Sequence, residues 1–290
     1  MKWEWLKNRG PCQPLTFRGV AAFADASCNR IVLMQFVVAL MAAWAVVWFV
    51  NSAWCPIVSR AIDRLPETGQ IRGGILHSPE TEPRFLAESR MLAFSLDLLH
   101  TGLARVPAHV QVEFGRRDVH FRSLLGTAFL HYRNDYTIEF NRTALEPWWG
   151  AWRPPLLWIL FGSVLFGLIA TWWMLALAYS IPLWIAALLR DRRMGWASSW
   201  KLASASFIPG ALMMIVGIFA YGFGVISLVE FLVLQVIHWI VGWAYCIGGL
   251  LARPPASDVV ANPFDIQKKG VSVERDAKPK NPFSPPSANP

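Results

Sequence analysis

The sequence predicts an α-helical membrane protein with four transmembrane helices, a small, mainly antiparallel β domain inserted after the first of them, and a disordered C-terminal tail. Three observations predict this fold class. Of the 290 residues, 54% are hydrophobic and only 16% are charged, which is unusual for a soluble domain. The 16 tryptophans suit the bilayer interface, where indole is apolar on one side and wet on the other. Four apolar stretches are long enough to cross a hydrocarbon core of about 30 Å.

Hydropathy and chain breaks set the bounds of these four spans. They are predicted at residues 31–50, 156–179, 202–221 and 225–249, so that 156–250 forms a membrane bundle. The second apolar run continues past Pro182, and we expect its helix to end near Ser180, with residues 180–193 forming an interfacial segment. Between the third and fourth spans, Gly222-Phe223-Gly224 leaves room only for a tight turn.

Basic residues set the predicted orientation, because Lys and Arg are enriched in cytoplasmic loops. All seven lysines lie outside residues 51–147, at positions 2, 7, 201, 268, 269, 278 and 280. We therefore expect the N-terminal segment 1–30 and the tail 254–290 in the cytoplasm, the chain in the inner (plasma) membrane, and residues 55–150 outside. The net charge of +8 then reflects membrane topology, and no nucleic-acid partner is predicted.

The outside segment alternates apolar and polar residues, as a half-buried sheet does. Val110, Val112 and Phe114 alternate with polar residues, and a turn at 115–118 leads to a second strand that places Glu113 opposite His120. A second hairpin is predicted from residues 129–132 and 136–140. Further strand candidates are 70–76 and 91–99, and 85–91 could instead be helical.

This layout of one anchor, an outside β region and a cluster of spans resembles a bacterial multi-pass family described as maltodextrin-utilisation membrane proteins. The residues that carry the resemblance are Leu65-Pro66, the run from Gly69 to Leu76, and Phe94-Ser95-Leu96-Asp97. The resemblance implies the layout of the fold. It implies no activity, because the family has no settled one.

Motifs for catalysis or cofactor binding are missing from the sequence. Five of the six histidines lie in the outside domain, but none has HxH or HxxxH spacing and no cysteine joins them. Glu113 and His120 could give two metal ligands, but a surface ion pair explains them as well. We therefore predict no metal, no cofactor and no catalytic residue, and an enzyme is the less favoured class.

Ionisable side chains inside the membrane are the most informative polar residues. Glu230 and His238 lie on the fourth span, where Gln235 and, from the first span, Gln35 could join them in an intramembrane polar site. One hypothesis is a proton- or ion-coupled pathway. The alternative is a set of hydrogen bonds between helices that fixes their packing, which the lack of repeated charges favours.

Small residues recur every four positions on the second span at Ser163, Gly167 and Thr171. Such a stripe lets another helix approach closely. We expect it to pack against a helix of the same chain, as Ser206 and Gly210 of the third span should, with an oligomer interface as the alternative.

The tail 254–290 is rich in Pro, Ser, Asn and charge and has no apolar period, which predicts disorder. It holds two copies of one tripeptide, Asn262-Pro263-Phe264 and Asn281-Pro282-Phe283. These could be docking motifs, although chance repetition in such a composition is the simpler explanation.

Taken together, these patterns favour a binding or scaffolding protein whose outside β domain contacts an envelope or periplasmic protein. The alternative is a transporter or channel component that uses Glu230 and His238.

Overall fold

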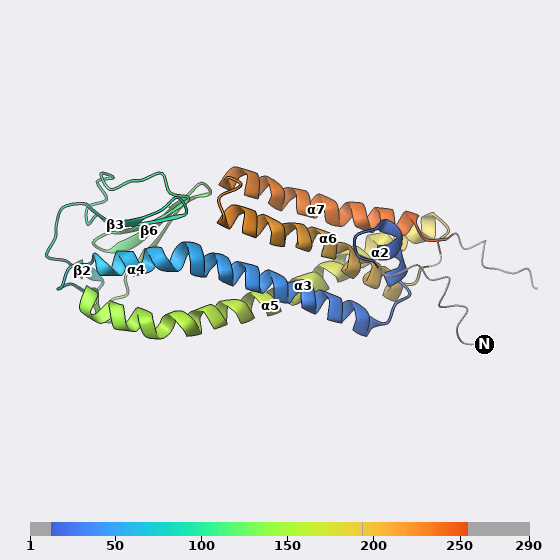
Figure 1. Ribbon diagram of the computed structural model, residues 1–290, viewed down its shortest axis with the longest axis horizontal. Coiled ribbons are helices and arrows are strands. Elements are labelled where there is room, and N and C mark those ends of the chain that lie inside the picture. Colours follow the sequence, from blue (N-terminus) through green and yellow to red (C-terminus); the bar gives the residue numbers. More distant parts are fainter. Residues whose placement is uncertain (1–12, 193, 255–290) are drawn as a thin grey trace, which may run out of the picture.

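The computed structural model describes residues 13–192 and 194–254 (Figure 1). Four of its helices are long and apolar enough to cross a membrane: residues 28–63, 142–189, 196–222 and 228–251. The first comprises α3 (Cys28–Phe49), the π-helical turn η1 (Val50–Trp54) and α4 (Cys55–Asp63). The others are α5 (Arg142–Leu189), α6 (Trp196–Gly222) and α7 (Leu228–Leu251), and a short helix α2 (Phe17–Phe23) precedes α3. The four predicted spans are therefore confirmed as helices.

Helix α5 continues where we expected it to end. It runs without a break through Pro182 to Leu189, so the predicted end near Ser180 and the separate segment at 180–193 are wrong. Proline removes one backbone donor from a helix, whereas ending the helix in an apolar environment would leave several backbone groups without partners. Continuing the helix through Pro182 therefore loses fewer backbone hydrogen bonds than ending it there.

The helices differ in length, and this difference makes room for the β domain. At 1.5 Å per residue, α5 is about 72 Å long and the α3–η1–α4 helix about 54 Å, against about 40 Å for α6 and 36 Å for α7. At one end of the bundle, α4 and α5 extend beyond α6 and α7, and the β domain lies beside α4 at this step (Figure 1). The indole of Trp149 in α5 donates to Ser59 Oγ in α4 at 3.0 Å, which joins the two extensions.

The outer surface of the bundle is apolar. Large side chains such as Leu33, Trp158, Phe166, Val236 and Trp239 are exposed along α3, α5 and α7. A patch of this kind would be unfavourable in water, and lipid is the solvent that fits it.

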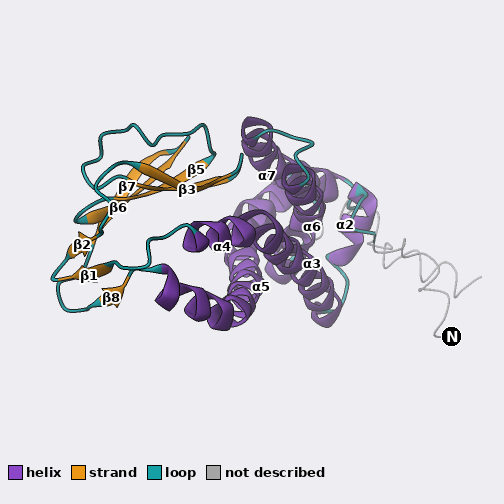
Figure 2. Cartoon of the chain, turned by 60° about the vertical axis from the view of Figure 1, so that its left-hand side comes forward, coloured by secondary structure: helices purple, strands orange, loops and turns teal. Residues whose placement is uncertain are grey.

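The β domain contains two sheets (Figure 2). The smaller has the order β2-β1-β8, from β1 (Gln70–Arg72), β2 (Ile75–His77) and β8 (Ile138–Glu139). The larger has the order β3-β4-β5-β6-β7, from β3 (Arg84–Glu88), β4 (Leu92–Leu96), β5 (Val110–Phe114), β6 (Asp118–Ser123) and β7 (Gly126–His131). Neighbours are antiparallel except β4 and β5, which are parallel and are joined by the long connection 97–109.

The structure confirms one predicted hairpin and corrects the other. Strands β5 and β6 pair as expected, with Glu113 opposite His120. The hairpin predicted from 129–132 and 136–140 is wrong, because β7 turns back onto β6 and β8 pairs with β1. The helical alternative for 85–91 is wrong as well, since these residues include most of β3.

One face of the larger sheet forms the core of the domain. Leu92, Leu96 and Val112 pack in a buried cluster with Ile57 and Ala61 of α4. The extended helix therefore supplies part of the hydrophobic core on which the domain depends.

Helix α6 packs closely on α7 through glycine, as expected for Gly210. A Cβ atom added at Gly210 would lie 2.8 Å from the carbonyl oxygen of His238, closer than real contacts allow. Gly162 in α5 has no such neighbour within 4 Å.

Replacing each glycine by alanine should therefore have opposite effects. Gly210→Ala should lower the free energy of unfolding by about 1–3 kcal/mol, because α7 must shift. Gly162→Ala should be neutral or should raise it by up to about 1 kcal/mol through helix propensity. Denaturant titration in detergent measures both, and equal stability of the two variants would contradict the packing described.

Candidate functional site

The second face of the larger sheet is polar but buried. The connection 97–109 covers it, and Ser95, Gln111 and Glu113 lie beneath with almost no exposure. Gln111 Nε2 donates to Ser95 Oγ at 3.2 Å and to the carbonyl of Ala104 at 2.8 Å, which holds the covering segment in place. Buried polar side chains are retained where they have partners or a function.

Asp97 begins this covering segment. Its carboxylate accepts hydrogen bonds from Thr101 Oγ1 and from the backbone N–H of Gly102, both at 2.9 Å. Burial raises the pKa of Asp97, but the hydrogen bonds from Thr101 and Gly102 outweigh it, so the pKa lies below its ordinary value. The carboxylate therefore stays ionised and stabilises the turn at residues 97–102, which contains His100.

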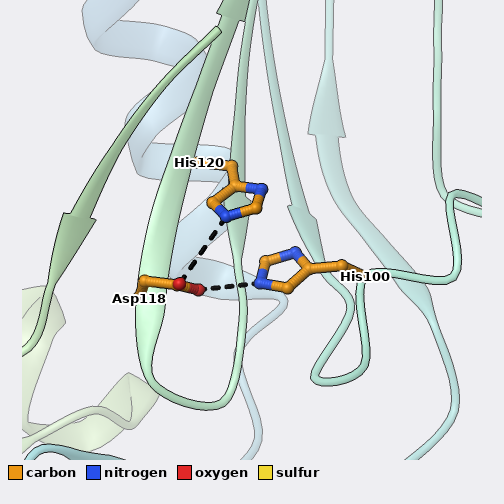
Figure 3. A group of neighbouring side chains, drawn as sticks. All are labelled: His100, Asp118 and His120. Atoms are coloured by element: carbon orange, nitrogen blue, oxygen red, sulfur yellow. Dashed lines mark hydrogen bonds and ion pairs between the residues drawn. The ribbon is translucent and has the colours of Figure 1, made fainter.

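His100 stands at the centre of a cluster of charged and titratable side chains (Figure 3). Its Nδ1 lies 2.5 Å from Glu113 Oε1 and its Nε2 lies 2.7 Å from Asp118 Oδ1. The His120 ring stacks on the His100 ring with 3.8 Å between centroids, and His120 Nε2 is 3.6 Å from Asp118 Oδ2. Arg122 Nη2 donates to Glu113 Oε1 at 3.1 Å.

Two acidic groups dominate the electrostatics of this cluster. Glu113 is fully buried, so its charge needs compensation from Arg122 and from His100. Burial lowers the pKa of His100, but its bonds to Glu113 and Asp118 and the charges of both acids outweigh this and raise it. The cluster therefore favours a cationic group between the two carboxylates.

Gly115 leaves the space that His100 occupies. A Cβ atom there would lie 2.1 Å from His100 Nε2 and 2.9 Å from Asp118 Oδ1. A side chain at this position would therefore displace the imidazole of the covering segment, which lies against the backbone of the turn between β5 and β6.

The sequence revealed only part of this cluster. Strand register placed Glu113 opposite His120, and the structure confirms that pairing. From the sequence we weighed Glu113 and His120 as possible metal ligands but did not consider Asp118, which shares one face of β6 with His120 because the two are two residues apart. No pattern could place His100, which reaches the site from an irregular segment at a positive φ of 52°.

The other side of the domain meets the turn between α6 and α7. Arg90 Nη2 donates to the carbonyl of Ile226 at 2.8 Å, and His109 Nδ1 lies 2.6 Å from the hydroxyl of Tyr221. Burial and the nearby Arg90 charge lower the pKa of His109. These contacts connect the sheet to the shorter pair of helices.

The four polar residues singled out in the membrane do not form one site. Gln35 is buried, donates to the Ser204 carbonyl at 3.2 Å and accepts from the Trp173 indole at 3.1 Å, so it bonds three helices together. Glu230 is exposed and forms a capping box with Ser227 at the start of α7. The packing interpretation therefore describes Gln35, whereas Glu230 caps its own helix.

Gln235 and His238 do lie near each other. They line a cavity of about 330 Å³ between α3, α5, α6 and α7, whose other walls are mainly apolar, with Trp172 and Phe207 among them. His238 Nδ1 contacts the carbonyl of Gln235 within its own helix. Neither Glu230 nor Gln35 lines this cavity.

The small-residue stripe of α5 faces away from the bundle. Ser163, Gly167 and Thr171 are all exposed, and a Cβ atom at Gly167 would meet nothing within 4 Å. The expectation that they pack against a helix of the same chain is wrong, because spacing defines a face of a helix but not its neighbour. Ser206 and Gly210 of α6 are buried as expected.

The tripeptides Asn262-Pro263-Phe264 and Asn281-Pro282-Phe283 lie outside the described residues, as do nearly all of the tail and residues 1–12. Those predictions stay predictions.

The chain matches no known protein family, no curated protein and no solved structure. The resemblance to the maltodextrin-utilisation membrane family therefore also stays a prediction, and the geometry carries the functional argument.

The larger sheet ends in a free edge. Among the residues that the structure describes, strand β7 pairs only with β6, all six of its residues are exposed, and Phe129 and Leu130 are 63% and 65% accessible. The preceding turn exposes Leu124 and Leu125. The opposite edge strand, β3, contacts α4.

The contact of His109 with Tyr221 should weaken in acid. A lowered pKa means that the unfolded state takes up the proton first, so this contribution is complete above the ordinary value of 6.5 and is lost as the pH falls below it. We expect the unfolding temperature of the wild type to fall between pH 7.5 and pH 5.5 by more than that of His109→Gln, which cannot titrate. Parallel curves for the two proteins would contradict the contact.

Proposed function

We propose that this chain is a binding protein of the bacterial inner membrane, which holds its β domain on the outer side and uses the free edge of β7 to bind an extended segment of an envelope or periplasmic protein. The single observation that carries the proposal is that edge, whose six residues are all exposed and include apolar side chains.

An unpaired edge strand presents a row of N–H and C=O groups that another strand can extend. Soluble domains usually protect such an edge with charge, proline or a bulge. Residues 124–130 contain no charged residue and no proline. Strand β7 pairs with β6 in regular register, without a bulge. An added strand would bury Phe129, Leu130, Leu124 and Leu125, so we expect the bound segment to be extended and apolar.

The framework that holds β7 supports this function. The sheet rests on α4, which continues from a membrane-spanning helix, and is connected to α6 and α7 through Arg90 and His109. A binding edge held by rigid elements loses little conformational entropy on association. The lack of lysine between residues 51 and 147 supports the outer location.

The transport alternative has less support. Its acidic member, Glu230, caps the first turn of α7 and does not line the cavity beside His238. Gln35 bonds helices together away from that cavity.

A photo-crosslinking residue tests the edge directly. Placed at Ala128 in living cells, it should give one adduct of fixed mass with another protein, because Ala128 lies in the middle of β7. The matched control is Leu103, an exposed leucine of the same domain outside the sheet, where the same residue should not give this adduct.

A second variant distinguishes strand addition from nonspecific hydrophobic association. Leu130→Lys, which charges the edge, should reduce the Ala128 adduct about tenfold or more, while Leu103→Lys should leave it unchanged. Equal labelling from positions 128 and 103, or an adduct made only of two copies of this chain, would contradict the proposal.

A further inference from the structure

The polar face of the sheet brings three metal-ligating side chains together, two of them on β6, the strand that pairs with β7. One ligand atom each from His100, Asp118 and His120 lies within 4.8 Å of the others (Figure 3). We propose that these residues form a binding site for a divalent first-row transition-metal ion, for which Zn²⁺ is the probe. The site is additional to the proposed binding edge and does not depend on it.

The ligand types select the class of ion. Two imidazoles and one carboxylate suit borderline ions such as Zn²⁺ and Fe²⁺, whereas Mg²⁺ and Ca²⁺ prefer sites made of oxygen. Three protein ligands with a fourth position left open is the arrangement of a zinc site that also binds water or an external group.

The distances are close to those that such an ion needs. With bonds of about 2.0–2.1 Å and tetrahedral angles, neighbouring ligand atoms lie about 3.3 Å apart. His100 Nε2 and Asp118 Oδ1 are 2.7 Å apart, and His120 Nε2 and Asp118 Oδ2 are 3.6 Å apart. The third pair is the two imidazoles, which stack with 3.8 Å between ring centroids, so one ring must turn out of the stack for both Nε2 atoms to point at a shared ion.

A second layer of residues prepares His100 for this role. Metal-binding histidines usually donate their other ring N–H to a carboxylate, which fixes the tautomer and points the free nitrogen at the metal. Glu113 Oε1 lies 2.5 Å from His100 Nδ1, so Nε2 is the atom directed at Asp118. Arg122 in turn holds Glu113, which has no exposed surface.

Charge and access both favour an ion at this place. Glu113 and Asp118 carry two negative charges against the single charge of Arg122, which leaves one negative charge when the imidazoles are neutral. The ligand side chains of His100, Asp118 and His120 remain 24%, 19% and 21% exposed, so an ion can reach them from solvent.

The position of the His100 ring depends on Gly115, because a Cβ atom there would displace the imidazole from the cluster. Glu113 Oε2 and His120 Nδ1 are buried without a hydrogen-bond partner in the described part of the chain, so hydrogen bonding alone does not account for the burial of this cluster.

Zinc binding to the purified full-length protein, measured by chelator competition in detergent, tests the site. The wild type should bind one Zn²⁺ in the domain. His100→Gln and His120→Gln should each raise Kd by about 100-fold or more, since losing a ligand exceeds the 10–100-fold effect of losing an outer partner. His77→Gln, a histidine on β2 outside the cluster, is the matched control and should leave Kd unchanged.

Gly115→Ala tests the geometry while keeping all three ligands. By displacing His100 it should weaken Zn²⁺ binding about 10–100-fold, and thermal unfolding without metal establishes that the variant is folded. Co²⁺ should give visible ligand-field bands in the wild type that His100→Gln and His120→Gln lose. The proposal is overturned if binding is not saturable, if His100→Gln and His120→Gln bind as the wild type does, or if His77→Gln loses the ion equally.

Discussion

The backbone of a chain in hydrocarbon must satisfy its own hydrogen bonds, and the rest of this structure depends on that constraint. It explains why the apolar part of α5 stays helical through Pro182, where the sequence suggested an end. Because α5 and the α3–η1–α4 helix are longer than α6 and α7, the bundle ends in a step. The β domain lies at this step and takes part of its core from α4.

The two faces of the larger sheet have separate tasks. The apolar face packs with α4 and gives the domain its stability. The opposite face would be solvated in an ordinary antiparallel sheet, but the parallel pairing of β4 and β5 requires a long crossover, which covers it. This arrangement buries Glu113 and brings His100 to Asp118 and His120. The proposed metal site therefore depends on the parallel pairing of β4 and β5. The proposed binding edge lies on β7, at the end of the same sheet.

Sequence patterns predicted what depends on local periodicity. Hydropathy located the four helices, and alternation placed Glu113 opposite His120. Sequence patterns did not predict contacts between distant segments. Apolar alternation in β7 and β8 does not determine which strand each pairs with. The spacing of the small residues of α5 does not show that their face points away from the bundle. For Glu230, the spacing from Ser227 is that of a capping box and could have been read from the sequence, and the structure shows that Glu230 caps α7.

The central claim is that the four apolar helices cross the membrane and hold the β domain on the outer side. Cysteine labelling in intact spheroplasts tests it most directly, in a variant without the four native cysteines. A membrane-impermeant maleimide should label Leu125→Cys, at the exposed turn before β7, and should label Asp191→Cys, after α5, only once the cells are opened. Labelling of Asp191→Cys but not of Leu125→Cys in intact cells would contradict the account.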